Sequence, residues 1–390
     1  MLRHVFIINV KEGISDDVVE RKMAEMRAMK EKETVIDNIM VGRTRGLFGR
    51  PDAVMMVIDL KDKAAFDVLI QSRTHTDIAE KAEEAFECRH CPNRILTLKT
   101  ECMETVKLNN GIEMPVLGYG VFQVSPEECE RCVLDAISAG YRLIDTAQAY
   151  YNEEGVGAAV AKCDVPRNEL FLTTKVWITN AGEEKAARSI DESLRKLRTD
   201  YIDLLLIHQP FADYPGTWRA MEKAVRNGKV RAIGLSNFYP DRFVDMAEYA
   251  DIKPAVNQLK TNVFSQQWDA EVEMNPYGTR IMAWGPLAQG DPDLTTHPVM
   301  AGLAEKYGKT AQQVALRYLA QRGIIAIPKS THIERMKQNL DVFDFSLTAE
   351  DMESIRPLDK PADFRWSHRN PELVKFLLNY DKQFNPDNKK

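Results

Sequence analysis

The chain has 390 residues, 44% of them hydrophobic, so it can bury a large core and is long enough for two domains. Its 52 basic and 58 acidic side chains give a net charge of -6 and are spread along the sequence, which disfavours nucleic acid or an anionic membrane as a partner. No run reaches the roughly 20 apolar residues of a membrane-spanning helix, and the opening residues lack the apolar core of a signal peptide, so we expect a cytoplasmic protein.

The first part of the chain, residues 1–98, shows the order strand, helix, strand, strand, helix, strand. The predicted strands are RHVFIINV, VIDNIMVGRTRG, AVMMVIDL and NRILTLK, and the predicted helices are SDDVVERKMAEMRAMKEK and DKAAFDVLIQSRTHTDIAEKAEEAF. This order predicts an α+β domain with a four-stranded, largely antiparallel sheet and two helices on one face.

Two of these strands, HVFIINV and AVMMVIDL, carry apolar residues on both faces, although the helices can cover only one face. The other face needs a cover, which either a second copy of the chain or the second domain can provide. A symmetric partner is the commoner solution in soluble proteins. We therefore expect a homodimer formed through this domain.

Through its opening RHVFIINVKEG, its VGRTRG strand end and its RTHTDIAEK helix, this segment resembles the stress-responsive dimeric A/B barrel domains, which are ferredoxin-like. The resemblance implies two sheets closed into a barrel across a dimer, around a small-molecule cavity that His4 and His75 would face. A lone histidine in such an element is more often a core or surface residue. Because the segment has no acid-base cluster, dimerisation or ligand capture is favoured over chemistry such as oxygenation.

Residues 99–106 contain neither proline nor glycine, so we expect a short linker there. Over residues 107–360, apolar strands alternate with amphipathic helices, after a predicted hairpin at VKLNNGIEMP. The eight strand segments are VLGYG, YRLIDTA, ELFLTTKV, YIDLLLIH, VRAIGLSN, PAVNQL, RIMAWGPL and IIAIPKS. They predict an α/β fold, a (β/α)8 TIM barrel, followed by a tail over residues 361–390. A doubly wound open sheet is the competitor, but no G-x-G-x-x-G follows the first strand.

Three consecutive predicted strands end on a titratable residue in an otherwise apolar run, namely Asp145, Lys175 and His208. In a barrel these ends share the rim that carries the active site, and Tyr150 follows Asp145 closely. Any one of them alone is as readily a satisfied core residue, but four on one rim favour a catalytic site. We expect Asp145 and Lys175 to pair and the cation to lower the pKa of Tyr150, which would then protonate a carbonyl oxygen that His208 orients.

The segments DTAQAYYNEEGVG, TTKVW, DLLLIHQP, AIGLSNF, PAVNQ and IPKSTHIERMKQN occur in the order and spacing of the aldo-keto reductases, which residues 107 to about 355 resemble. The resemblance implies that Tyr150, Asp145, Lys175 and His208 form a catalytic tetrad. It also implies NADPH-dependent reduction of an aldehyde or ketone to an alcohol, with Tyr150 as the general acid. The alternative is an NADPH-binding redox sensor or scaffold with little turnover, against which the intact tetrad counts.

The same resemblance implies a cofactor site along the strand ends. It assigns Ser236, Asn237, Gln258 and Trp284 to the nicotinamide, Leu287 and Gln289 to the pyrophosphate, Lys329, Ser330 and Arg335 to the 2′-phosphate, and Gln338 and Asn339 to the adenine. Two cations at a helix start suit a phosphate, so NADPH is favoured over NADH.

The substrate pocket is the least specified part of the site. Trp177, Tyr151 and Phe211 are expected to join His208 in contacting the substrate. Tyr151 replaces a small glycine of the family, and TNVFSQQ lacks the family's usual His-Pro, so the sequence does not name the carbonyl substrate.

The six cysteines include two C-x-x-C pairs, Cys88 with Cys91 and Cys129 with Cys132. Two such pairs can in principle bind zinc, but their separation exceeds that of common zinc ribbons, and the second pair lies in a predicted amphipathic helix. We favour reduced thiols over a metal or redox site and expect no metal.

Overall fold

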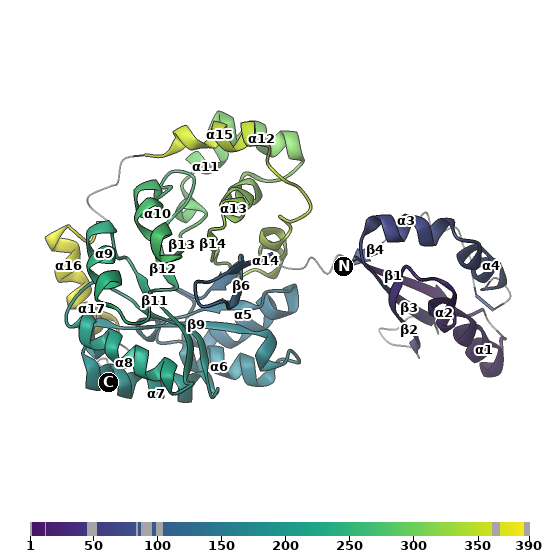
Figure 1. Cartoon of the computed structure of the whole chain (residues 1–390), viewed down its shortest axis with the longest axis horizontal. Coiled ribbons are helices and arrows are strands. Elements are labelled where there is room, and N and C mark those ends of the chain that lie inside the picture. Colours follow the sequence, from purple (N-terminus) through teal and green to yellow (C-terminus); the bar gives the residue numbers. More distant parts are fainter. Residues whose placement is uncertain are drawn as a thin grey trace. The chain divides into compact units, whose positions relative to one another are not determined.

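The computed structural model describes residues 2–11, 13–44, 53–82, 85–86, 96–98, 104–360 and 367–385. The chain divides into two compact units, Met1–Cys102 and Met103–Lys390 (Figure 1). Within the described ranges, no helix is both long enough and apolar enough to cross a membrane.

The first unit contains a four-stranded antiparallel sheet in the order β2-β3-β1-β4. Its strands are β1 (Leu2–Asn9), β2 (Ile36–Thr44), β3 (Ala53–Leu60) and β4 (Leu96–Leu98), and its helices are α1 (Asp16–Arg27), α2 (Met29–Lys32), α3 (Lys63–Gln71) and α4 (Arg73–Ala82). On β3, Met56 and Ile58 are buried in a cluster with residues of α1, whereas Met55 points to the opposite face and is exposed.

Both helical stretches predicted for this unit are divided in two. Ser72 separates α3 from α4, because its backbone is extended (φ -71°, ψ 146°) and its Oγ accepts a hydrogen bond from the backbone N–H of His75 at 3.1 Å. A capping serine inside a continuous apolar pattern therefore ends one helix and starts the next. His75 is half-buried on α4, and His4 pairs with Ile58 in the β1 and β3 register.

The second unit contains eight parallel strands that form one sheet in chain order. They are β7 (Gly118–Gly120), β8 (Leu143–Asp145), β9 (Phe171–Val176), β10 (Ile202–Ile207), β11 (Val230–Ser236), β12 (Val256–Lys260), β13 (Arg280–Trp284) and β14 (Ile325–Ala326). A parallel bridge between Leu117 and Ala326, with a hydrogen bond of 2.8 Å from Ala326 N to Val116 O, joins the first strand to the last. The predicted (β/α)8 barrel is confirmed.

Helices pack around this barrel and follow it at the carboxyl end of the chain (Figure 1). They are α5 (Pro126–Ala139), α6 (Glu153–Lys162), α7 (Glu183–Leu197), α8 (Tyr214–Arg226), α9 (Pro240–Tyr249), α10 (Trp268–Met274), α11 (Asp293–Thr296), α12 (Pro298–Tyr307), α13 (Ala311–Gln321), α14 (Ile333–Leu340), α15 (Ala349–Ile355), α16 (Pro371–Leu378) and α17 (Tyr380–Phe384). A hairpin of β5 (Thr105–Lys107) and β6 (Glu113–Pro115) precedes β7, so its first strand includes the last two residues assigned to the linker.

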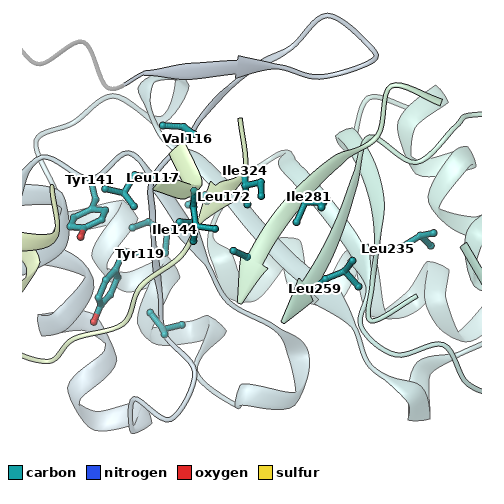
Figure 2. Packing of buried hydrophobic residues seen from close by; sticks show 14 of the residues in the cluster. Val116, Leu117, Tyr119, Tyr141, Ile144, Leu172, Leu235, Leu259, Ile281 and Ile324 are labelled. Atoms are coloured by element: carbon teal, nitrogen blue, oxygen red, sulfur yellow. The ribbon is translucent and has the colours of Figure 1, made fainter. Parts of the chain in front are cut away.

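Alternate side chains of each barrel strand point inward and outward. On β10, Leu204 and Leu206 belong to the cluster inside the barrel, whereas Leu205 and Ile207 belong to the larger cluster between strands and helices. Figure 2 shows part of that outer cluster, with Ile144 among residues from several strands. The barrel is therefore a packed core, and only its ends are free to hold a site.

The predicted catalytic residues continue the rows of side chains that point into the barrel. Asp145 lies two residues after the inward Leu143, and His208 lies two residues after the inward Leu206. Lys175 is paired in register with Leu206, so it occupies the same inward row. Three titratable side chains thus share the carboxyl end of the barrel interior.

Candidate active site

Lys175 is fully buried and connects the other groups of the site. Its Nζ donates hydrogen bonds to Oδ1 of Asp145 at 2.6 Å, to the backbone oxygen of Thr146 at 2.9 Å and to the hydroxyl of Tyr150 at 3.2 Å. The other carboxylate oxygen of Asp145 accepts a hydrogen bond from Nε2 of Gln258 at 2.9 Å. This buried ion pair is therefore fully hydrogen-bonded, which is the condition for tolerating charge inside a protein.

Tyr150 reaches Lys175 because a short 3-10 helix, η2 (Gln148–Tyr150), follows β8. Gln148 holds this turn in place, since its Oε1 accepts from the backbone N–H of Trp177 at 3.0 Å and its Nε2 donates to Ser193 at 3.1 Å. The turn ends at Tyr151, whose φ of 56° is unfavourable for a bulky side chain. The surrounding structure must therefore hold Tyr151.

His208 completes the group that the structure brings together. Its ring packs edge-on against Tyr150 and Trp177, with centroid distances of 5.6 and 4.9 Å. Its Nδ1 is buried and has no hydrogen-bond partner within the described ranges. Asp145, Tyr150 and His208 all line one cavity.

Burial controls the protonation of these groups. Burial raises the pKa of Tyr150, and the Lys175 ammonium only partly opposes the rise. This direction is opposite to the lowering expected from the sequence, because the sequence does not show how deeply the phenol is buried. Burial acts to lower the pKa of Lys175, but Asp145 and Tyr150 outweigh it and the net direction is upward. Burial, with the charge of Lys175, lowers the pKa of His208 well below its usual range.

The cavity has a volume of about 1080 Å³. All the predicted cofactor residues line it, namely Ser236, Asn237, Gln258, Trp284, Leu287, Gln289, Lys329, Ser330, Arg335, Gln338 and Asn339. Trp177, predicted to contact the substrate, lines it as well.

The lining chemistry fits a phosphorylated dinucleotide. Lys329 and Arg335 form no ion pair within the described ranges, and they lie just before and within the first turn of α14. Unpaired cations at a helix start suit a phosphate. Trp284 donates its indole N–H to Oδ1 of Asn237 at 2.9 Å, which fixes an aromatic ring at the cavity wall for stacking.

Two predicted substrate contacts, Tyr151 and Phe211, are not among the lining residues. The Tyr151 hydroxyl instead donates to Oδ1 of Asp381 at 2.6 Å, and Thr179 donates to the other oxygen of Asp381 at 2.8 Å. These bonds attach α17 to the loops after β8 and β9. Phe211 packs against His368, with ring centroids 6.0 Å apart.

The tail had no predicted role, yet it forms part of the cavity wall. Its lining residues are His368, Leu373, Phe376, Leu377 and Tyr380. The last four have the spacing i, i+3, i+4, i+7 of an amphipathic helix, and this is the signal that would have identified the segment.

The cysteine pair on α5 is part of the core. Cys129 and Cys132 are both buried, and burial raises the pKa of both thiols, that of Cys129 to about 12. Cys88 and Cys91 lie outside the described residues. In the described ranges, no group of three or more His, Cys, Asp or Glu side chains is arranged to hold a metal ion.

Comparison with known proteins identifies the family of the second unit. The aldo/keto reductase family matches residues 116–360. Glyoxal reductase of Bacillus subtilis (strain 168) is 44% identical over 265 residues, which cover 67% of this chain and 95% of that protein. Morphine 6-dehydrogenase of Pseudomonas putida is 41% identical over 268 residues, which cover 65% of this chain and 90% of that protein.

Solved structures agree with this assignment. An aldo-keto reductase enzyme from a Medee basin deep-sea metagenome library is 42% identical, with a TM-score of 0.64, over 66% of this chain and 97% of that chain. A Bombyx mori aldo-keto reductase in complex with NADP is 35% identical, with a TM-score of 0.64, over 69% of this chain and 98% of that chain. The chain therefore belongs to the aldo/keto reductase family and is an NADP-dependent oxidoreductase whose cofactor is NADPH or NADP+.

Proposed function

We propose that this protein reduces an aldehyde or a ketone to the alcohol with NADPH and that Tyr150 is the general acid. The observation that carries the proposal is the hydrogen bond of 3.2 Å between Lys175 Nζ and the Tyr150 hydroxyl, at the wall of the large cavity. The relatives named glyoxal reductase and morphine 6-dehydrogenase support interconversion of a carbonyl and an alcohol.

Each group of the tetrad has a separate part in this reaction. NADPH, when bound, supplies the hydride. Tyr150 keeps its proton at neutral pH and gives it to the carbonyl oxygen. The ammonium of Lys175 stabilises the negative charge left on the phenol oxygen, and Asp145 keeps that ammonium in position. His208, which is neutral, orients the carbonyl oxygen by a hydrogen bond.

The cofactor residues are proposed to act in three groups. Gln258 uses Nε2 for Asp145, but its carbonyl oxygen accepts no hydrogen bond from any described residue and is left for the nicotinamide carboxamide, beside Ser236 and Asn237. Lys329, Ser330 and Arg335 are proposed to bind the 2′-phosphate. The remaining proposed contacts are Trp284 on the nicotinamide ring, Leu287 and Gln289 at the pyrophosphate, and Gln338 and Asn339 at the adenine.

The competing function is a sensor or scaffold that binds NADPH with little turnover. Steady-state oxidation of NADPH in the presence of excess 4-nitrobenzaldehyde separates the two. We expect many equivalents of NADPH to be consumed per chain, with one equivalent of 4-nitrobenzyl alcohol formed for each. Tight NADPH binding with consumption of about one equivalent would instead favour the sensor.

We further propose that the first unit is a ferredoxin-like domain that pairs with a second copy of itself. The antiparallel strand order β2-β3-β1-β4, with helical connections after β1 and β3, supports the fold. On the face opposite the buried cluster, Met40 and Met55 are 49% and 37% exposed. Exposed methionines on a sheet face favour a protein partner over water as the cover.

A further inference from the structure

The ammonium of Lys175 has three N–H groups, and each of them has its own acceptor. Two acceptors, the Asp145 carboxylate and the backbone oxygen of Thr146, belong to buried residues. The third is the Tyr150 hydroxyl, at 3.2 Å. Because the three N–H directions of an ammonium are fixed relative to one another, the first two bonds decide whether the third points at the phenol oxygen. The Thr146 oxygen, 2.9 Å from Nζ, therefore takes part in aligning Lys175 with Tyr150.

The direction of the Thr146 carbonyl is held from two sides. The backbone N–H of Thr146 donates to the backbone oxygen of Thr173 on β9 at 2.9 Å. The side-chain Oγ1 of Thr146 donates to Oδ1 of Asn152 at 2.8 Å. Because both its N–H and its side chain are bonded, Thr146 cannot rotate freely, and its carbonyl stays directed at Lys175.

The amide of Asn152 also holds the loop after β7. Its Nδ2 donates to the backbone oxygens of Val121 and Val124 at 3.0 and 3.1 Å. Between these two residues lies Phe122, which lines the cavity and whose ring centroid lies 5.0 Å from that of Tyr150. Phe122 is 45% exposed, so its own packing holds it only weakly. The backbone that Asn152 holds therefore sets the position of this ring against Tyr150.

Asn152 uses its side chain for these loops rather than for the helix that follows it. It directly precedes α6, where an asparagine side chain ordinarily accepts a hydrogen bond from the first helical turn. Its side chain makes no such bond with the described residues of α6, and its oxygen and amide group serve Thr146, Val121 and Val124 instead. Asn152 is 1% exposed, so these bonds are made in a buried environment. This use of a capping residue favours a role in the site over a role in the helix.

We propose that Asn152 is a positioning residue for proton transfer from Tyr150. Its amide holds the Thr146 carbonyl that directs the Lys175 ammonium, and it holds the loop whose Phe122 packs against the phenol ring. The phenol is thereby aligned from the side of the cation and from the side of the ring. This inference rests on the proposed carbonyl reduction, and it adds to the tetrad a residue that lies behind the described lining of the cavity.

The test removes the bond between Thr146 and Asn152 from each side. Thr146→Val keeps the shape and the backbone carbonyl but loses the hydroxyl donor, Thr146→Ser keeps the donor, and Asn152→Leu removes all three amide bonds. For each variant we measure NADPH affinity by protein fluorescence and kcat/KM for 4-nitrobenzaldehyde in ordinary and in deuterated water, which gives the solvent isotope effect. The matched control is Thr279→Val, which removes a buried hydroxyl bond of 2.7 Å to Pro254, just before β13 at the amino end of the barrel.

Thr146→Val is expected to lose about three- to tenfold in kcat/KM, the effect of one lost neutral hydrogen bond, with NADPH affinity retained. Its solvent isotope effect should rise, because a misaligned phenol makes proton transfer a slower step of the reaction. Thr146→Ser and Thr279→Val should keep the wild-type kcat/KM and isotope effect. Asn152→Leu should lose more, and adding Thr146→Val to it should cause no further loss, because the shared bond is already absent.

A wild-type kcat/KM in Thr146→Val, or a lower one with an unchanged isotope effect, would overturn the inference and leave Asn152 as a structural residue. So would an equal loss in Thr279→Val, or a further loss when Thr146→Val is added to Asn152→Leu. If Asn152→Leu does not fold, the two Thr146 variants decide alone. Failure of the wild-type chain to reduce 4-nitrobenzaldehyde would reject the proposed carbonyl reduction itself, whereas wild-type reduction with any of the contrary outcomes would reject only the role of Asn152.

Discussion

Burial favours the neutral forms of both Tyr150 and His208, which are the forms that the proposed reduction requires. The raised pKa of Tyr150 retains the phenol proton as the pH rises, and the lowered pKa of His208 keeps that ring neutral as the pH falls. Both shifts come first from desolvation of the charged form. Proton transfer from Tyr150 also requires the resulting phenolate to be stabilised. Lys175 can provide this because its Nζ lies within hydrogen-bond distance of the phenol oxygen.

The pH dependence of the reduction follows from these directions. Because neither Tyr150 nor His208 titrates in the neutral range, kcat/KM should be flat between about pH 6 and pH 9. The decline at high pH should begin only above the ordinary tyrosine pKa, and the decline at low pH should begin well below the ordinary histidine pKa. The measurement is kcat/KM for 4-nitrobenzaldehyde at constant ionic strength across this range. A break near pH 6.5 would show that His208 titrates as an exposed histidine and contradict the assignment.

The candidate site residues were easier to predict from the sequence than their burial and pKa values. Asp145, Lys175 and His208 were singled out because a titratable residue at the end of an apolar run is conspicuous. The direction of the Tyr150 pKa was wrong, because burial depends on packing by residues distant in the chain. His368 was missed, since a single histidine in a polar segment has no pattern that indicates a cavity.

Strands and helices were predicted where the hydrophobic pattern extended over many residues. Seven of the eight barrel strands lie within the predicted segments, and β12 extends one residue beyond its segment, to Lys260. Parallel strands buried on both faces read as continuous apolar runs, which is why they were predicted. Successive side chains of a strand alternate between its two faces. His208, two residues after the inward Leu206 and directly after the end of β10, therefore lies on the inward side as well. The division of α3 from α4 was not predicted, because Ser72 caps a helix inside an uninterrupted pattern.

The position of the tail depends on contacts with distant parts of the chain. Residues 371–384 form two helices whose aromatic and aliphatic side chains cover part of the cavity. Their attachment depends on Asp381, which accepts from Tyr151 and Thr179, more than 200 residues earlier in the chain. Hydrogen bonds between segments so far apart leave no local signal in the sequence.

The exposed face of the first unit's sheet gives a prediction about assembly. If Met40 and Met55 pack against a second copy, the full-length chain should have twice the mass of one chain by size exclusion with light scattering. Met40→Asp combined with Met55→Asp should shift it to the monomer, because burying two carboxylates without partners is unfavourable. The exposed helix residue in Glu31→Gln serves as the control. A wild-type chain that is monomeric at tens of micromolar would reject the dimer.

In the whole molecule, the proposed catalytic and cofactor residues all belong to one unit. Tyr150, Lys175, His208 and the lining of the cavity lie within Met103–Lys390. The family match covers residues 116–360, and the relatives are matched over 90% or more of their own length by about two thirds of this chain. We therefore expect the chemistry to be carried by the second unit, and we expect the first unit to contribute to assembly or ligand capture.

The central claim is that Tyr150 gives the proton in carbonyl reduction, and Tyr150→Phe tests it most directly. The substitution removes one hydroxyl and keeps the ring that packs against His208. NADPH affinity is measured by protein fluorescence and kcat/KM with 4-nitrobenzaldehyde, with Tyr249→Phe, at an exposed tyrosine on α9, as the control. We predict a loss of about 100-fold or more in kcat/KM with NADPH affinity retained, as expected for removal of a general acid. Reduction by Tyr150→Phe at the wild-type rate would contradict the account.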